Sequence, residues 1–225
     1  MWHERDVESP TVAAGPDSLP WRGDPLPRGR HKLSAEEVRA SQRARILRAM
    51  LELVAERGYG PTSVPDVVSA ARVSRSGFYA LFEDKAECFL AVIDELASEL
   101  LRGLFDLRDI DDWDAAVERG VDIYLSFWRE QPLFARAYLV ELPAAGENAV
   151  VHRERQLMRF EALFDALAGW ARERDPSLLP VNPLASRLLV GGITEIVARE
   201  VRAGRTAALG SLRGELVALV RDTIA

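Results

Sequence analysis

The sequence predicts an all-α protein in which an N-terminal three-helix domain precedes a larger C-terminal helical domain, with about nine helices in all. Three observations lead to this fold class. Apolar residues recur with a helical period from about residue 36 onward, no segment alternates apolar and polar residues between hairpin turns, and clusters of Gly and Pro interrupt the helical pattern. These breaks fall at 58–61, 132, 143–146, 175–176, 180–183 and 204–210.

Capping residues mark where the helices begin. Ser34 and Glu37 have the spacing of a capping box at the start of the first helix. Thr62 is the expected cap of the second helix, and Ser74 and Asp84 are the expected caps of the next two. The expected helices span 36–57, 64–71, 75–81, 85–107, 113–130, 132–142, 148–174, 183–203 and 210–224.

The composition indicates a globular protein without a membrane anchor. Of the 225 residues, 48% are apolar, yet no apolar run approaches the roughly 18 residues that span a bilayer. The first nine residues include three acids and no apolar segment follows them, which excludes a secretory signal. The single cysteine, Cys88, excludes a disulfide framework within the chain. We therefore expect a cytoplasmic protein with no membrane partner.

The first part of the chain, residues 1–33, is expected to be a flexible tail. Prolines and glycines recur in it without a helical period. It ends in the basic segment Arg28–Lys32, for which two interpretations stay open: an arm that enters a DNA minor groove, or a solvated basic stretch. We assign residues 34–95 to a DNA-binding domain and residues 96–225 to a second domain.

Charge is unevenly distributed along the chain. The formal net charge is −6, which taken alone argues against a nucleic-acid partner. Residues 28–85, however, hold eleven bases and seven acids, whereas residues 86–225 hold sixteen bases and twenty-three acids. The basic block is a candidate surface for phosphate, although a solvated helix face would have the same composition.

Residues 62–82 have the pattern of a helix-turn-helix. Two short helices are separated by the three residues 72–74, and in such a unit the second helix lies in a DNA major groove. The start of that helix presents Arg75, Ser76 and Gly77, where Arg suits guanine and Ser suits either base type. Phe78 and Phe82 are expected to pack in the core. Spacing alone also fits a helical protein that does not bind DNA.

The order of residues resembles the N-terminal domain of the tetracycline-repressor (TetR) family. The resemblance covers about residues 41–95 and includes Gly58-Tyr, then Thr62-Ser-Val, then Ser74-Arg-Ser-Gly-Phe-Tyr-Ala-Leu-Phe with Lys85 behind it. Arg72 departs from the family, which usually has Gly in the turn. The resemblance implies a dimeric transcription regulator. By position it assigns phosphate contact to Thr62, Ser74, Tyr79 and Lys85 and base-edge contact to Arg75, Ser76 and Gly77, while Arg72 either contacts DNA or is solvent-exposed.

The second domain has no pattern of an enzyme, a metal site or a bound cofactor. It lacks a phosphate loop and a nucleophile elbow, and the three histidines of the chain are far apart in sequence. Aromatic residues recur at helical spacing, as in a packed core, and the resemblance places an effector cavity among the same helices. The residues that we expect to touch a small hydrophobic effector are Tyr124, Phe127, Trp128, Tyr138, Phe160 and Phe164.

The last two helices are expected to form a homodimer interface. Each is apolar over a stripe wider than packing against one neighbour requires, and Gly191 and Gly192 would permit close helix approach. The expected interface residues are Leu188, Gly191, Gly192, Leu216 and Val220. A two-fold dimer predicts a pseudo-palindromic operator.

The sequence therefore favours a ligand-responsive DNA-binding regulator, most simply a repressor that a small hydrophobic effector releases from double-stranded DNA. The alternative is a helical small-molecule-binding or interaction module with a vestigial helix-turn-helix. The Arg72 departure and the modest charge of the basic block support that alternative.

Overall fold

The computed structural model describes Trp21 and residues 34–224 apart from 106, 108, 109, 111, 179 and 183. Within this part of the chain there are nine α-helices and no strand, which confirms the all-α expectation. They are α1 (Ala35–Arg57), α2 (Val64–Ala71), α3 (Arg75–Tyr79), α4 (Lys85–Phe105), α5 (Trp113–Glu130), α6 (Pro132–Arg136), α7 (Glu147–Arg174), α8 (Ala185–Arg202) and α9 (Arg213–Ile224).

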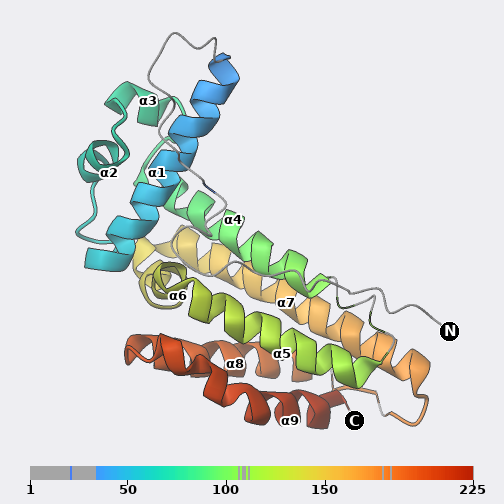
Figure 1. The fold of residues 1–225 in the computed structure, drawn as a ribbon. Helices are drawn as coiled ribbons and strands as arrows, with labels where there is room; N and C mark the ends of the chain where they lie inside the picture. The colour runs from blue at the N-terminus through green and yellow to red at the C-terminus, as the bar shows by residue number, and fades with distance from the viewer. Residues whose placement is uncertain are drawn as a thin grey trace, which may run out of the picture.

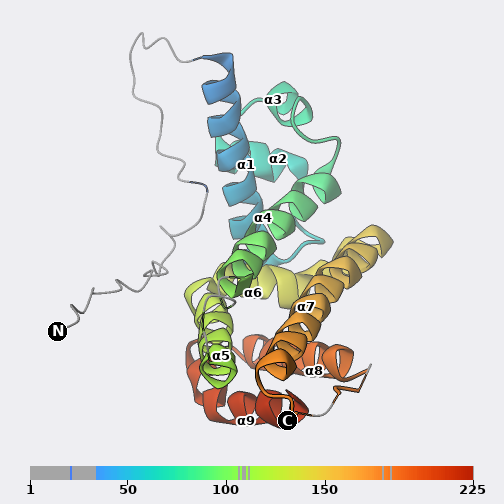
Figure 2. The same cartoon turned by 90° about the vertical axis from the view of Figure 1, so that its right-hand side faces the viewer.

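The helices are arranged in three levels along the molecule. Helices α1, α2 and α3 lie at one end, α8 and α9 lie at the other, and α5, α6 and α7 lie between them (Figures 1 and 2). Helix α4 starts beside α3 and runs into the middle level (Figure 2). Its buried residues belong to one continuous hydrophobic cluster that extends from α1 to α9.

Local side-chain caps begin the N-terminal helices. Ser34 and Glu37 form the expected capping box, with Glu37 N donating to Ser34 Oγ (3.1 Å) and Ser34 N donating to Glu37 Oε2 (2.7 Å). Asp84 accepts from Glu87 N (2.8 Å) at the start of α4. The expected cap at Thr62 is wrong by one residue, because Ser63 caps α2 and forms a capping box with Asp66. The Thr62 hydroxyl instead donates to Gly58 O (2.8 Å).

The segment after α5 differs from the single helix expected over 132–142. Helix α6 ends at Arg136, a π-helical turn η2 covers Ala137–Glu141, and a 3₁₀ turn η3 covers Leu142–Ala145. Pro143 has no backbone N–H and so cannot continue an α-helical ladder. Gly146, with φ of 96°, then turns the chain into α7.

The predicted flexible tail lies outside the described residues except at one position. Trp21 is buried, and its indole Nε1 donates to Glu95 of α4. The prediction did not include this contact. The basic segment Arg28–Lys32 also lies outside the described residues.

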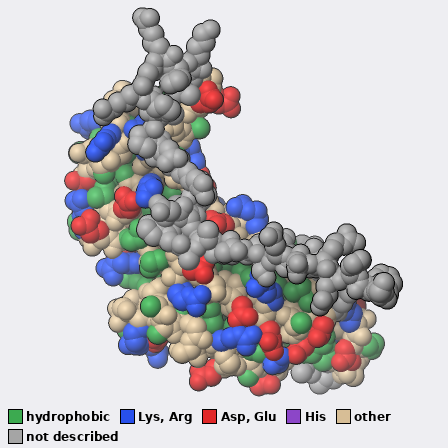
Figure 3. Space-filling view, viewed as in Figure 1, with side chains coloured by type: hydrophobic (Ala, Val, Ile, Leu, Met, Phe, Trp, Pro, Cys, Tyr) green, Lys and Arg blue, Asp and Glu red, His purple; other side chains and the backbone are tan. Residues whose placement is uncertain are grey.

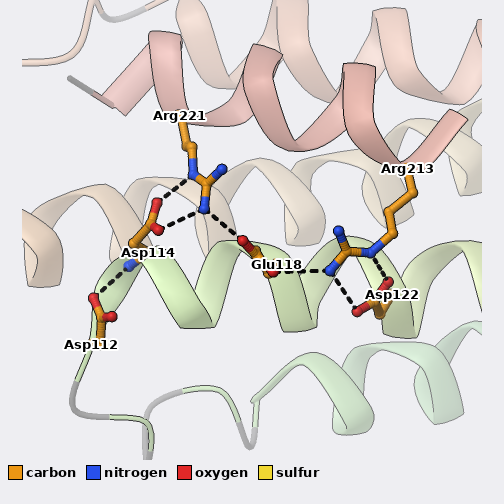
Figure 4. A network of polar contacts seen from close by, with 6 residues as sticks. All are labelled: Asp112, Asp114, Glu118, Asp122, Arg213 and Arg221. Carbon is orange, nitrogen blue, oxygen red and sulfur yellow. Dashed lines mark hydrogen bonds and ion pairs between the residues drawn. The ribbon is translucent and has the colours of Figure 1, made fainter.

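Helices α5 and α9 are joined by a network of ion pairs (Figure 4). Arg213 donates to Asp122 Oδ1 (2.7 Å) and to Glu118 Oε2 (3.0 Å). Arg221 donates to Glu118 Oε1 (2.7 Å) and to both oxygens of Asp114. Acidic and basic side chains are also interspersed over the lower part of the face in Figure 3. Much of the acidity of the second domain is therefore balanced locally.

None of the helices in the described part of the chain combines the length and the apolar character that crossing a membrane requires.

Glu118 provides a test of this network. Hydrogen bonds from Arg213 and Arg221 lower the pKa of the Glu118 carboxyl. A carboxyl whose pKa is lower in the folded state than in the unfolded state stabilises the fold at pH values above the ordinary pKa of Glu. This contribution disappears as the pH falls through the folded-state pKa. We expect Glu118→Gln to lower the melting temperature at neutral pH, and we expect the difference from the unsubstituted protein to shrink in high salt and at acidic pH.

The measurement is thermal unfolding followed by circular dichroism. Glu154→Gln is the matched control, because Glu154 is exposed on α7 and has no ion pair among the described residues. Equal melting temperatures of the two variants at neutral pH would mean that the network does not stabilise the fold.

Candidate DNA-binding surface and effector cavity

The turn between α2 and α3 has the geometry that the helix-turn-helix requires, in spite of its arginine. Arg72 has φ of 53° and ψ of 48°, and it is the one non-glycine residue with positive φ in the described part of the chain. Arg45 Nη1 on α1 donates to Ala71 O (3.0 Å) and to Arg72 O (3.2 Å). Helix α1 therefore fixes the left-handed turn by donating to the carbonyl oxygens of Ala71 and Arg72.

Helix α3 presents a polar edge to solvent. Ser74 caps it by accepting from Gly77 N (3.0 Å), and its hydroxyl lies 3.0 Å from that of Ser76. Arg75 and Ser76 are exposed, and Tyr79 is 50% exposed. A Cβ on Gly77 would lie 3.2 Å from Ser74 Oγ, so a larger residue would crowd the cap.

The opposite side of α3 anchors it to the domain. Phe78 and Phe82 are buried, and their ring centroids lie 5.6 Å apart. This confirms the expected core packing of both residues. The anchored face leaves Arg72, Ser74, Arg75, Ser76 and Tyr79 on one accessible edge.

Two of the residues assigned to phosphate contact are engaged within the domain. Thr62 is 1% exposed and its hydroxyl donates to Gly58 O, so this side chain is not available to a phosphate. Lys85 Nζ donates to Tyr59 O and to Thr62 O, both at 2.9 Å, and lies 4.0 Å from the centre of the Tyr59 ring. Burial lowers the pKa of this ammonium group. Its charge therefore holds the loop between α1 and α2 against α4.

An apolar cavity of about 190 Å³ lies within the second domain. Its wall on α5 extends from Ala116 to Trp128, which corresponds to about 18 Å of helix at 1.5 Å per residue. Helices α4, α7, α8 and α9 and the π-helical turn η2 supply the other walls. The cavity is therefore elongated along α5.

Most of the expected effector residues line this cavity. They are Tyr124, Trp128, Tyr138, Phe160 and Phe164. Phe127 is not among the lining residues, because it packs on the other side of α5 against Trp128 and Phe134 at centroid distances of 5.3 and 5.9 Å. Sequence reasoning missed the aliphatic walls, among them Leu104 of α4 and Leu189 of α8.

Two of the five expected dimer residues face inward. Leu216 and Val220 are 3% and 7% exposed and line the cavity, so their assignment to the interface is wrong. Leu188 is 72% exposed, and Gly191 and Gly192 are exposed on the same helix. A Cβ built on either glycine meets no described atom within 4 Å. The sequence did not single out three further exposed apolar residues, which are Leu184 just before α8, Ile196 on α8 and Leu219 on α9.

The polar groups around the cavity belong to a small set of residues. Burial raises the pKa of Tyr124 to about 12. Hydrogen bonding with Trp128 and Thr194 and the charge of Arg153 act in the opposite direction and lower this pKa. Burial also raises the pKa of Tyr138, again against the charge of Arg153. Both phenols are therefore neutral hydrogen-bond donors at physiological pH. Among the described residues, no group of His, Cys, Asp and Glu is arranged to hold a metal ion.

Comparisons with known proteins agree with this arrangement. Residues 46–92 match the family profile described as bacterial regulatory proteins, tetR family. The chain is 27% identical over 135 residues to the HTH-type transcriptional activator FasR of Mycolicibacterium smegmatis, covering 57% of this chain and 62% of FasR. It is 41% identical over 49 residues to the transcriptional regulator AcuR of Cereibacter sphaeroides, covering 22% of each. The chain thus aligns with less than two thirds of either curated relative.

Solved structures share the fold over most of the chain. The fatty acid degradation regulator FadR from Bacillus halodurans has a TM-score of 0.71 at 18% identity, covering 78% of this chain and 96% of that one. FadR from Bacillus subtilis, solved in complex with stearoyl-CoA, has a TM-score of 0.71 at 17% identity with the same coverage.

Fold and surface together define a helix-turn-helix protein with a helical second domain that encloses a cavity. The part that matches the tetR family profile, residues 46–92, contains the whole helix-turn-helix, α2 and α3. The curated relatives that the chain matches are transcriptional regulators.

The left-handed Arg72 leads to a stability prediction. A residue with a Cβ in this conformation costs roughly 1 kcal/mol relative to Gly. We expect Arg72→Gly to raise the free energy of unfolding by up to about 1 kcal/mol, measured by urea denaturation. Arg75→Gly makes the same chemical change in a right-handed helix and should lower it. The turn is not strained if both variants lose stability equally.

Proposed function

We propose that this protein is a ligand-responsive transcriptional repressor that binds a pseudo-palindromic operator as a homodimer and is released by a hydrophobic acyl ligand. The DNA-binding domain would comprise residues 34–95. The domain that binds the effector and dimerises would comprise residues 96–225. The observation that carries the proposal is the combination of an exposed polar edge on α3 with an elongated apolar cavity, between which α4 extends.

The edge of α3 suits the major groove. Arg75 and Ser76 at the start of the helix would meet base edges, where Arg forms bidentate bonds to guanine. Ser74, Tyr79 and the backbone at Gly77 would lie beside them, with Ser74 and Tyr79 on phosphates. Arg72 is exposed in the turn and adds positive charge at the same edge.

The cavity suits a long hydrocarbon chain. Its length along α5 greatly exceeds the size of a compact aromatic ligand, and its walls are mainly aliphatic and aromatic. One structural neighbour is a fatty acid degradation regulator, and another was solved in complex with stearoyl-CoA. We therefore assign the effector to the class of long-chain fatty acyl compounds.

Contacts between the two domains would transmit the ligand's effect. Leu104 at the end of α4 lines the cavity, and Lys85 at its start is bonded to the loop that precedes α2. Between them, Glu95 on α4 pairs with Arg43 of α1. A displacement of α4 by a ligand would therefore change the position of α3 in each subunit. Such coupling requires that the ligand prefer one of the two positions.

The exposed surface of α8 fits a subunit interface. Leu188 and Ile196 lie on it together with the two exposed glycines, and Leu184 directly precedes it. Large apolar side chains beside glycines would permit a close, symmetric helix contact.

The alternative of a vestigial helix-turn-helix loses its main support. Arg72 adopts the left-handed turn without disrupting it, and α2 and α3 keep their caps. The recognition edge is therefore intact.

A gel-shift titration tests the proposal. The DNA is the region upstream of the protein's own gene, and a shuffled duplex is the control. We expect salt-dependent, sequence-selective binding that palmitoyl-CoA or palmitate abolishes. Equal affinity for both duplexes, or operator binding that neither compound changes, would refute it.

Arg75 provides a sharper test of α3 as the recognition helix. A bidentate Arg–guanine contact contributes about 1–3 kcal/mol, so Arg75→Ala should weaken operator binding roughly tenfold to a hundredfold. Selectivity at one base position in each half-site should also relax. Arg159→Ala on α7 removes an equal exposed charge and should leave affinity unchanged. Equal losses in both variants would indicate a general charge effect.

Leu188 tests the subunit interface. A charge placed at the centre of a buried apolar contact is strongly unfavourable, so Leu188→Glu should convert the dimer to monomer and abolish operator binding. Sedimentation velocity measures the oligomeric state. Met158→Glu on α7, also at an exposed apolar residue, should remain dimeric. A dimeric Leu188→Glu variant would place the interface elsewhere.

A further inference from the structure

One end of the cavity carries two buried polar groups without partners. Tyr138 is 2% exposed and Trp128 is 3% exposed, and both line the cavity. The Tyr138 hydroxyl forms no hydrogen bond within the described part of the chain. The Trp128 indole Nε1 is buried without a partner of good geometry there, although it lies close enough to the Tyr124 hydroxyl to lower the pKa of that phenol. Their rings lie 5.6 Å apart, so the two groups belong to one site.

Leaving such groups unpaired is costly for a folded protein. A buried donor without an acceptor costs about 1–3 kcal/mol, and most buried polar groups in proteins are paired. The indole N–H only donates, and a neutral phenol both donates and accepts. Together they match a ligand atom that accepts two hydrogen bonds, such as a carbonyl or carboxylate oxygen.

Two neighbours extend this polar end. Tyr124 lines the cavity one helical turn before Trp128, with 5.9 Å between the ring centres. Arg153 of α7 is half-buried and forms no ion pair with a carboxylate among the described residues. It lies one helical turn before Leu157, which lines the cavity, and its charge opposes the rise in pKa that burial causes at Tyr124 and Tyr138. The end of the cavity is therefore rich in donors and electropositive.

The rest of the cavity offers no comparable group along α5. Between Ala116 and Val121 its wall on this helix is aliphatic, and Leu216 and Val220 of α9 are also part of the lining. The polar end and the apolar length thus impose a direction on any elongated ligand.

We propose that Trp128 and Tyr138 bind the acyl oxygen of the effector, with Tyr124 and Arg153 beside it, and that the hydrocarbon chain extends along α5 toward Ala116. This inference rests on the proposed function and adds a headgroup site to it. A carboxylate and a thioester carbonyl present the same acceptor oxygen, so the site accommodates a free fatty acid or its coenzyme A thioester.

Direct binding measurements on the full-length protein test this site. The probes are palmitate, palmitoyl-CoA and the apolar dye N-phenylnaphthylamine, which has no acyl oxygen. We expect Tyr138→Phe to weaken binding of an acyl probe roughly tenfold and to leave dye binding unchanged. Ser211→Ala is the control, because it removes an exposed hydroxyl outside the cavity and should change neither.

A second variant covers the case in which Tyr138→Phe alters the cavity itself. Trp128→Phe removes the indole N–H, and it should weaken acyl binding relative to dye binding in the same way. Unchanged acyl affinity in both variants overturns the proposal, as does a proportional loss of acyl and dye binding in both.

The two sources of the oxygen are separated by Arg153→Gln. If the carboxylate occupies the site, this variant should weaken palmitate more than palmitoyl-CoA, whereas a thioester carbonyl predicts a Tyr138→Phe effect on palmitoyl-CoA alone. Failure of the proposed function gives a different result, since the unsubstituted protein would then bind neither acyl probe or would keep its operator when they bind.

Discussion

The structure depends on one constraint: α4 has to be buried in two places at once. Phe89 and Val92 are fully buried near its start, and Leu100 and Leu104 are buried near its end. An α-helix of this length is a rigid rod, so its two ends cannot be packed independently. The position of the helix-turn-helix is therefore linked to the packing around the cavity by the helix itself.

Polar contacts reinforce this constraint at adjacent residues of α4. Asp94 accepts from Gln156 Nε2 of α7 (2.7 Å), and His152 Nε2 lies 2.9 Å from the same Asp94 oxygen. The next residue, Glu95, pairs with Arg43 of α1 and accepts from Trp21. Two consecutive carboxylates thus attach α4 to opposite partners, one in each part of the molecule. Lys85 completes the attachment through the carbonyl oxygens of Tyr59 and Thr62.

The sequence predicted features that depend on neighbouring residues better than features that depend on the whole chain. Caps at Ser34 and Ser74 were correct because a cap is a local hydrogen bond. Ser63 and Thr62 are equivalent in type, and only the structure shows which one faces the helix end. Leu216 was assigned to the wrong surface because helical periodicity reveals an apolar face without identifying what covers it. The two carbonyls that bind Lys85 could not be predicted for the same reason, since they are 23 and 26 residues earlier in the chain.

A second route between the cavity and the helix-turn-helix runs through the π-helical turn η2. Tyr138 on this turn lines the cavity, and three residues later Glu141 accepts a hydrogen bond from Tyr59 N (3.1 Å) beside the C-terminal end of α1. A π-helical turn is less favourable than an α-helical one and commonly marks a functional site. A ligand oxygen bonded to Tyr138 would act on the same turn that holds Tyr59, while the hydrocarbon chain would act on Leu104 of α4. The headgroup and the hydrocarbon chain of the ligand would then influence the recognition helix α3 through separate contacts. A ligand with both parts would therefore shift the position of α3 more than either part alone.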